Sequence, residues 1–136
     1  MQNNHRFSVQ VYYEDTDHSG VVYHANYLKF FERAREHLLG VEHLVDLYQN
    51  QGIGFVVYKA ELTYKKGAEF GDNITIETSL TLESEYRLIF HQNAILPEGN
   101  IPLVLGRIEL VCVGPKKNLV RLPPIVMQKL KEKNFL

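Results

Sequence analysis

Residues 24–40 read HANYLKFFERAREHLLG, and their apolar side chains recur at intervals of three and four. That spacing places the apolar side chains on one face of an amphipathic α-helix. The residues on this face are Tyr27, Phe30, Phe31, Ala34, Leu38 and Leu39. We therefore predict a buried helix over residues 24–39, with Asn26 as its N-cap and Gly40 as its stop.

The segments outside this helix alternate between apolar and polar residues, which is the period of a β-strand. Strands are predicted at residues 6–13, 55–64, 74–82, 86–96 and 103–113. The second of these segments should carry one apolar face made of Val56, Tyr58, Ala60, Leu62 and Tyr64. The last segment is apolar on both faces apart from Arg107 and Glu109, which indicates a central strand.

Short polar links between the later strands predict that consecutive strands are antiparallel neighbours. Residues 97–100, Pro-Glu-Gly-Asn, are typical of a hairpin turn. Weaker helical patterns cover residues 41–51 and 125–133. The order of one strand, a long helix and four antiparallel strands predicts an α+β fold in a single domain, residues 1–136.

The composition is that of an ordinary soluble globular protein, with 136 residues, 45% apolar and 23% charged. The formal net charge of −1 carries no electrostatic footprint for nucleic acid. No apolar run approaches the length of about 18 residues that a transmembrane helix needs. The polar start of the chain does not resemble a signal peptide, so we expect a cytoplasmic protein.

The single cysteine, Cys112, excludes an internal disulfide framework and a cysteine-based zinc site. It lies in the apolar run Leu-Val-Cys-Val at residues 110–113, where a small buried thiol is expected.

Acidic and imidazole groups gather in residues 12–27, YYEDTDHSGVVYHANY, between the first strand and the long helix. Residues 15–20 copy the opening of a calcium loop, but Asn26 stands where that loop needs a bidentate Glu. A second interpretation is a transition-metal site, although its spacing matches no zinc motif. The ligands of such a site would be Asp15, Asp17, His18 and His24.

A third interpretation uses the start of the helix, where unpaired N–H groups and the positive end of the helix dipole lie. Asp17 precedes that start by a few residues, and Gly20 permits a sharp reversal between Asp17 and His24. The Asp17 carboxylate then faces N–H donors across a gap that a carbonyl group can enter, as in an oxyanion hole. The positive field should keep this carboxylate ionised.

The motifs of this region identify a family resemblance. The chain reads YEDTD at residues 13–17, GVVYH at residues 20–24, Tyr27, FE at residues 31–32 and AR at residues 34–35. This pattern resembles the YbgC-like branch of the hotdog-fold acyl-CoA thioesterases, relatives of 4-hydroxybenzoyl-CoA thioesterase. The resemblance implies an antiparallel sheet of five to six strands wrapped around one central helix. It also implies homodimers or homotetramers with active sites at subunit interfaces.

The resemblance carries functional roles onto matching residues. Asp17 would be the nucleophile or the general base, and the backbone N–H of His24 would help to form the oxyanion hole. Tyr13 would lie beside the carboxylate, and Gly20 would let the thioester approach closely. Further substrate contacts are expected from Tyr23, Tyr27, Phe55, Val57, Lys59 and Arg87. No metal and no cofactor are expected.

The chain departs from the 4-hydroxybenzoyl branch at residues 84–86, Ser-Glu-Tyr, where that branch has a basic run that binds the phosphates of CoA. The cations available instead are Lys59, Lys65, Lys66, Arg87, Lys116 and Lys117. Acyl-CoA is the expected substrate, with acyl carrier protein open as an alternative carrier. Lysines 129, 131 and 133 leave peripheral contact with an anionic membrane open. A hydratase or dehydratase and a non-catalytic scaffold are the alternative functions.

Overall fold

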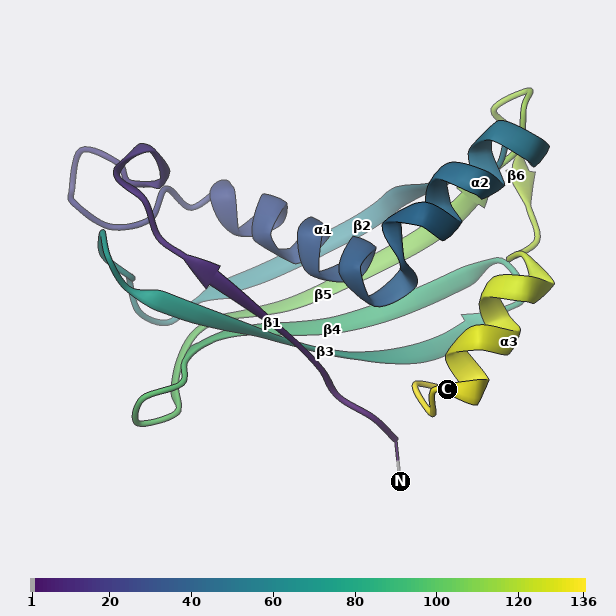
Figure 1. The fold of residues 1–136 in the computed structure, drawn as a ribbon. Coiled ribbons are helices and arrows are strands. Elements are labelled where there is room, and N and C mark those ends of the chain that lie inside the picture. The colour runs from purple at the N-terminus through teal and green to yellow at the C-terminus, as the bar shows by residue number, and fades with distance from the viewer. Residues whose placement is uncertain (1) are drawn as a thin grey trace.

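The computed structural model describes residues 2–136. The strands are β1 (His5–Gln10), β2 (Gly54–Tyr64), β3 (Asn73–Ser84), β4 (Arg87–Leu96), β5 (Ile101–Val113) and β6 (Leu119–Val120). The helices are α1 (Asn26–Leu39), α2 (Val41–Gln51) and α3 (Pro124–Glu132), with a short 3₁₀ helix, η1 (Tyr13–Asp15). The strands form one antiparallel sheet in the order β1-β3-β4-β5-β2, with β6 paired to β5. Figure 1 shows α1 lying across one face of this sheet, which confirms the predicted α+β fold.

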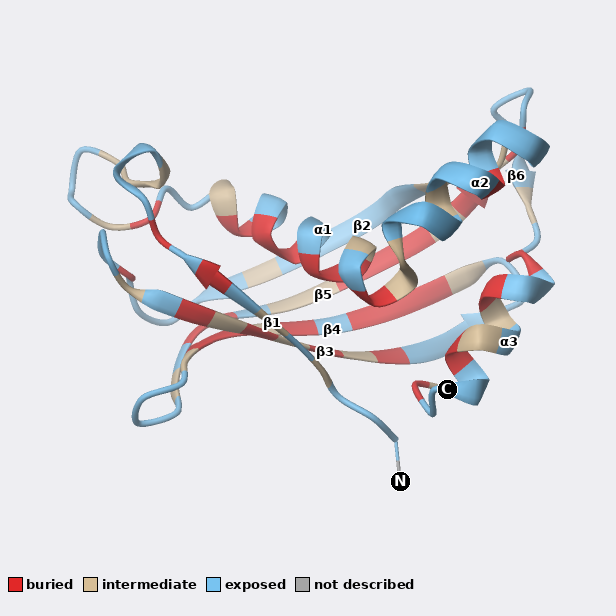
Figure 2. Ribbon diagram, viewed as in Figure 1, coloured by how far each residue is buried: buried red, intermediate tan, exposed pale blue. Residues whose placement is uncertain are grey.

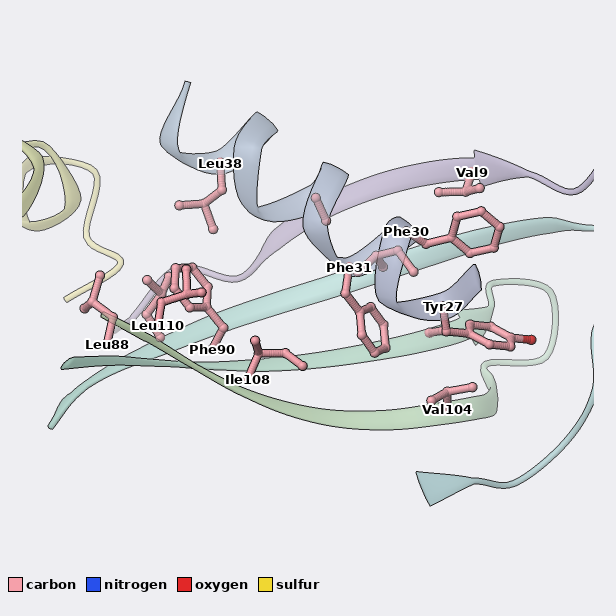
Figure 3. Close-up of a cluster of buried hydrophobic side chains, with 14 of the residues drawn as sticks. Val9, Tyr27, Phe30, Phe31, Leu38, Leu88, Phe90, Val104, Ile108 and Leu110 are labelled. Carbon is pink, nitrogen blue, oxygen red and sulfur yellow. The ribbon is translucent and has the colours of Figure 1, made fainter. Parts of the chain in front are cut away.

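The predicted apolar face of α1 is the face that meets the sheet. Its buried residues are Tyr27, Phe30, Phe31, Ala34, Arg35 and Leu38. They pack against inward side chains of the sheet such as Phe90, Val104 and Ile108 (Figure 3). Gly106 on β5 lies directly under the helix. A Cβ at this position would stand 2.6 Å from a ring carbon of Phe31. The helix can therefore sit close to the strand only while residue 106 is glycine.

A buried polar network links α1 to the sheet. The Arg35 guanidinium donates to Gln92 Oε1 at 3.0 Å, and Gln92 Nε2 donates to the Phe31 carbonyl and to Thr78 Oγ1 at 3.0 and 3.1 Å. Burial lowers the pKa of Arg35, and the carboxylates of Glu32 and Glu36 oppose that shift. The amide of Gln92 therefore satisfies a helix carbonyl and a buried cation at the same time.

Two predicted boundaries are wrong near the start of the chain. β1 ends at Gln10 rather than at residue 13, because the chain turns into η1, where the Tyr12 N–H donates to Asp15 Oδ2 at 2.8 Å. The long helix begins at Asn26 rather than at residue 24, and its N-cap is Ala25. The Asn26 side chain does not cap the helix, since its Nδ2 donates to the Asp15 carbonyl at 3.0 Å.

The predicted apolar face of β2 is confirmed at Ala60, Leu62 and Tyr64 and is wrong at Val56 and Tyr58. The register against β5 shifts between Val57 and Lys59, which leaves Tyr58 in a β-bulge without a partner. Val57 pairs with buried Leu110 on one side of the bulge, and Ala60 pairs with a buried residue of β5 on the other. The extra residue moves Tyr58 out of the inward set, and its ring instead lies under the guanidinium of Arg87.

The predicted neighbour relations hold for β3, β4 and β5, which form a meander with a turn at residues 97–100. They fail for β2, which pairs with β5 and forms an edge of the sheet. Residues 65–72 therefore do not form a hairpin. They connect β2, at one edge of the sheet, to β3, which lies between β1 and β4. As an edge strand, β2 is exposed along most of its length (Figure 2).

Cys112 is buried on the inner side of β5, as predicted. Burial raises the pKa of its thiol to about 12, so the thiolate that would be nucleophilic is disfavoured. Among the helices of residues 2–136, none has the length and apolar character needed to span a membrane.

Candidate active site

The loop between η1 and α1 is fixed by backbone contacts at both ends. Thr16 forms an isolated β-bridge with Val22, and Val21 forms one with Glu69 of the β2–β3 connection. The Tyr23 N–H donates to the Asp15 carbonyl at 2.8 Å. Between these contacts the chain reverses at Gly20, whose φ of +88° lies in the region that glycine adopts without strain. The loop therefore presents its side chains from a defined backbone.

Asp17 lies at the turn of this loop. Its Oδ1 accepts the hydroxyl of Ser19 at 2.6 Å and the backbone N–H of Ser19 at 2.8 Å. These bonds hold the pKa of Asp17 below its usual value, the hydroxyl having the largest effect, while His24 adds a smaller electrostatic contribution. The hydrogen bonds from Ser19 therefore favour the ionised carboxylate that the sequence predicts.

His24 precedes the first turn of α1. The hydroxyl of Tyr64 donates to the His24 carbonyl at 3.0 Å. The imidazole contacts the ring of Tyr23 with a centroid separation of 4.6 Å. Within residues 2–136 the N–H groups of His24 and Ala25 donate to no backbone carbonyl, and the Ala25 N-cap has no side-chain cap. This helix start therefore retains donors for another acceptor.

Asp17 and His24 line one cavity of about 320 Å³ at the start of α1. The residues that line it are Asp17, Val21, Val22, His24, Tyr27, Tyr64, Lys65, Lys66 and Gly67. A Cβ on Gly67 would stand 2.6 Å from Val21, so the two loops approach closely here. The cavity brings together a carboxylate, an imidazole and two lysines, beside a helix start where the N–H groups of His24 and Ala25 have no backbone acceptor among residues 2–136.

Tyr27 belongs to this cavity, as predicted for a substrate contact, while its ring is almost fully buried at 2% exposure. Burial raises the pKa of its hydroxyl to about 12, an effect that the Ala68 backbone amide reduces. The hydroxyl forms no hydrogen bond of normal geometry within the described chain. It lies at the margin of the buried cluster, turned away from the other labelled side chains (Figure 3).

The other predicted tyrosines lie outside the cavity lining. Tyr13 is 78% exposed, and its ring contacts Phe70 at a centroid separation of 6.1 Å. Tyr23 is half-exposed and contacts the cavity only through the ring of His24.

Phe55 and Val57 line a second cavity, of about 370 Å³, between α1 and β2. Buried Arg35 also lines this cavity, together with Glu32 and Glu36 on its rim. The structure therefore separates these two expected substrate contacts from Asp17. They line this second cavity, which we call the groove beside α1, and not the cavity of Asp17.

Lys59 and Arg87 are brought neither to Asp17 nor to the groove. Lys59 Nζ pairs with Glu61 at 2.8 Å. Arg87 pairs with Glu109 at 3.2 Å and stacks on Tyr58. Both cations are thus engaged by groups of the sheet itself.

Two contributors to the site were not predicted. Ser19 follows Asp17 by two positions, and the Asp-x-Ser spacing of an Asx turn is a local signal that identifies it. Tyr64 lies forty positions after His24 and meets it only because β2 forms an edge of the sheet. No local pattern carries that information.

The described residues do not form the set of metal ligands that the two metal interpretations require. No group of three or more His, Cys, Asp or Glu side chains within residues 2–136 is placed to hold a metal ion. Asp15 accepts the Tyr12 N–H, and Asp17 is turned toward Ser19.

Comparisons with known proteins identify the family to which the chain belongs. A family model described as the thioesterase-like superfamily matches residues 11–130. The acyl-CoA thioester hydrolase YbgC of Escherichia coli is 36% identical over 129 residues, which cover 93% of this chain and 96% of that protein. The chain belongs to the thioesterase-like superfamily. A second relative within it, the acyl-CoA thioesterase YbgC of Haemophilus influenzae, is 34% identical over 95% of this chain and 92% of its own.

Solved structures place this superfamily member among hotdog folds. The 1,4-dihydroxy-2-naphthoyl-CoA thioesterase of Synechocystis superposes with a TM-score of 0.85 at 24% identity, covering 94% of this chain and 95% of that one. A probable thioesterase of Bartonella henselae gives 0.81 at 32% identity, covering 89% and 100%. The hotdog fold and the YbgC-like resemblance that the motifs indicate are confirmed.

Proposed function

We propose that this protein hydrolyses the thioester of an acyl-CoA to a free acid and CoA. The observation that carries the proposal is the cavity at the start of α1 that Asp17 and His24 line together. Membership of the thioesterase-like superfamily supports it, as do relatives that are named acyl-CoA thioester hydrolase and acyl-CoA thioesterase.

In the proposed reaction the thioester carbonyl lies between Asp17 and the helix start. The carbonyl oxygen accepts the N–H groups of His24 and Ala25, which stabilise the negative charge that develops on it. Asp17 either attacks the carbonyl carbon or removes a proton from the water that attacks it. The C–S bond then breaks, and the thiolate leaves and takes up a proton. If Asp17 attacks, water hydrolyses the resulting anhydride and restores the carboxylate.

The hydrogen bonds of Asp17 support an ionised reactant at neutral pH. The hydroxyl and the N–H of Ser19 both donate to Oδ1, and they are the largest causes of the lowered pKa of this carboxyl. The His24 imidazole, which lines the same cavity, would orient the water or the leaving thiol.

The carrier of the acyl group remains open between CoA and acyl carrier protein. Lys65 and Lys66 are the cations nearest the reaction, since they line the cavity with Asp17. Both carriers present a phosphate to such cations. The acyl group itself would enter the groove beside α1, where Phe55 and Val57 supply apolar walls.

The proposed working unit is a homodimer joined through the edge of β2, or a tetramer of two such pairs. Lys59 and Glu61 flank Ala60 on this exposed edge strand. An antiparallel copy centred on Ala60 places Lys59 opposite Glu61 of the second chain, and the reverse. This self-complementary charge pattern supports pairing of the two edges.

The row of α1 side chains at positions 28, 32, 35 and 39, next to β2, would be self-complementary in the same way. Leu28, Glu32 and Arg35 line a cavity with Ala60, and Leu39 continues the row. Reversing the helix direction puts leucine opposite leucine and Glu32 opposite Arg35. Arg35 is buried yet has no ion pair among the described residues, so a partner's carboxylate would complete it.

The first test is thiol release from a panel of short, long and aromatic acyl-CoAs. We expect Asp17→Asn to lower turnover by about 10²–10⁴-fold. His24→Ala should lose less, because its backbone N–H remains. Asp46→Asn, an acid on exposed α2, is the matched control and should keep the wild-type rate.

A full-rate Asp17→Asn enzyme would exclude the proposed chemistry. If an enoyl thioester gave a hydroxyacyl product without thiol release, the protein would be a hydratase instead. If no acyl-CoA reacted, the same panel on acyl carrier protein would distinguish a different carrier from a non-catalytic scaffold.

A further inference from the structure

Tyr64, the last residue of β2, reaches across to the start of α1. Its hydroxyl donates to the His24 carbonyl at 3.0 Å. Its ring meets the His24 ring edge-on, with a centroid separation of 6.1 Å and an interplanar angle of 85°. It also meets Tyr27 at 6.1 Å and 63°. The hydroxyl is therefore held in position by packing on both neighbours.

The accepting carbonyl belongs to the peptide unit that joins His24 to Ala25. A peptide unit is planar, so fixing its oxygen also fixes the direction of the Ala25 N–H on its other side. Fixing it also restrains the backbone that carries the His24 side chain. A hydrogen bond received by the oxygen polarises the unit and makes its N–H a stronger donor.

At the start of α1, no capping side chain of the N-cap residue fixes the backbone. Ala25 is the N-cap and has no side chain that can cap the helix. Asn26 is anchored to the Asp15 carbonyl instead, on the far side of the same turn. Tyr64 is thus the side chain that holds the His24–Ala25 peptide among the described residues. Partial burial raises the pKa of Tyr64, so the donating proton is retained at neutral pH.

We propose that Tyr64 is a positioning residue, whose hydroxyl aligns the His24–Ala25 peptide toward the thioester carbonyl in the Asp17 cavity. The inference rests on the proposed thioester hydrolysis. It adds that the oxyanion-binding peptide is set by an edge strand of the sheet rather than by its own loop. The position of β2 thereby determines the orientation of the peptide that binds the thioester carbonyl.

The test compares Tyr64→Phe with Tyr58→Phe, the same change on the same strand. Tyr58 is exposed and its hydroxyl has no hydrogen bond among the described residues. Because small misplacements of reacting groups slow the chemical step, Tyr64→Phe should lower kcat by roughly 10–100-fold with KM little changed. The acid limb of its pH–rate profile should stay in place, since the Asp17 carboxylate is held by Ser19. Tyr58→Phe should behave as wild type.

A second readout does not depend on turnover. In a ¹H–¹⁵N spectrum the Ala25 amide resonance should shift in Tyr64→Phe and stay in place in Tyr58→Phe. An unshifted Ala25 amide, or equal kcat values for the two variants, would overturn the positioning role. A displaced acid limb would also overturn it, because Tyr64 would then act on Asp17. If the wild type released no thiol while the Ala25 shift appeared, the proposed reaction would fail and the structural link would stand.

Discussion

Ser19 lowers the pKa of the carboxyl group on which the proposed chemistry depends. Its hydroxyl and its N–H both donate to Asp17 Oδ1, and they are the largest causes of the lowered pKa of that carboxyl. The contribution of this carboxylate to stability is therefore present at neutral pH and is lost as the pH falls through its folded-state pKa. The same hydrogen bonds keep the reactive form available in mildly acidic solution.

Ser19→Ala removes the larger of these two bonds and leaves the backbone bond in place. The pKa of Asp17 should rise toward its usual value, so the acid limb of the kcat/KM profile should move to higher pH. Near neutral pH the carboxylate stays ionised, and the rate should remain close to that of the wild type. The pH–rate profile of thiol release measures both effects.

The control for this change is Ser8→Ala, on an exposed position of β1. Its acid limb should coincide with that of the wild type. An acid limb that stays in place in Ser19→Ala would mean that the serine does not tune Asp17.

At the residue scale, the sequence is sufficient to predict Asp17 and His24 as candidate reactive residues, but not to predict the contact of Tyr64 with His24. Asp17 and His24 are identifiable from one short segment, because the glycine-containing loop and the helix start are adjacent in the chain. Tyr64 is invisible to the same reasoning, since its contact with His24 depends on which strand forms the sheet edge. Lys59 and Arg87 were expected near the substrate, and their ion pairs within the sheet separate them from the cavity.

At the scale of elements, Gln92 is the polar link between α1 and the sheet. It is fully buried, accepts from Arg35 and donates to the Phe31 carbonyl in the middle of the helix. Replacing it removes the hydrogen-bond partner of a buried cation as well as a bond to the helix backbone.

Gln92→Leu keeps the size of the side chain and removes this link. We expect a loss of about 2–4 kcal/mol in the free energy of unfolding, because buried polar groups are left unpaired. Urea denaturation at fixed protein concentration measures it. His91→Leu, the exposed neighbour on β4, should change stability by about 0.5 kcal/mol or less. Equal midpoints for the two variants would show that the network does not stabilise the fold.

The elements themselves were largely predictable, and their arrangement was not. Alternation located β3 and β4, and a run that is apolar on both faces located β5; of the three, only β3 buries every second residue in a regular pattern. The bulge at Tyr58 broke the alternation in β2, so the apolar face predicted from the sequence is right from Ala60 to Tyr64 and wrong at Val56 and Tyr58. The helix start was misplaced because Asn26 bonds to Asp15 instead of capping.

At the scale of the whole molecule, buried side chains from Val9 to Phe135 form one cluster. The outer edge of β2 is not covered by another strand of the sheet that residues 2–136 form. An exposed edge strand is a template for pairing with another chain unless it is covered. The proposed dimer covers this edge with its own copy.

Reversing one charge on that edge tests the dimer. In Lys59→Glu, two carboxylates would face each other at both ends of the pairing, so the dimer should weaken. The double variant Lys59→Glu, Glu61→Lys restores opposite charges and should recover the dimer mass. Sedimentation equilibrium measures the masses, and an unchanged mass for Lys59→Glu would place the interface elsewhere.

The pairing of β2 with β5 also has a consequence for how the protein is made. β2 ends at Tyr64, while the strand that it joins begins at Ile101. During synthesis α1 and β2 therefore leave the ribosome well before the strand that holds β2 in the sheet. The contact between Tyr64 and His24 depends on that late, long-range pairing. A chain interrupted before residue 101 should thus contain every residue that lines the Asp17 cavity and still lack the strand that fixes β2 in place.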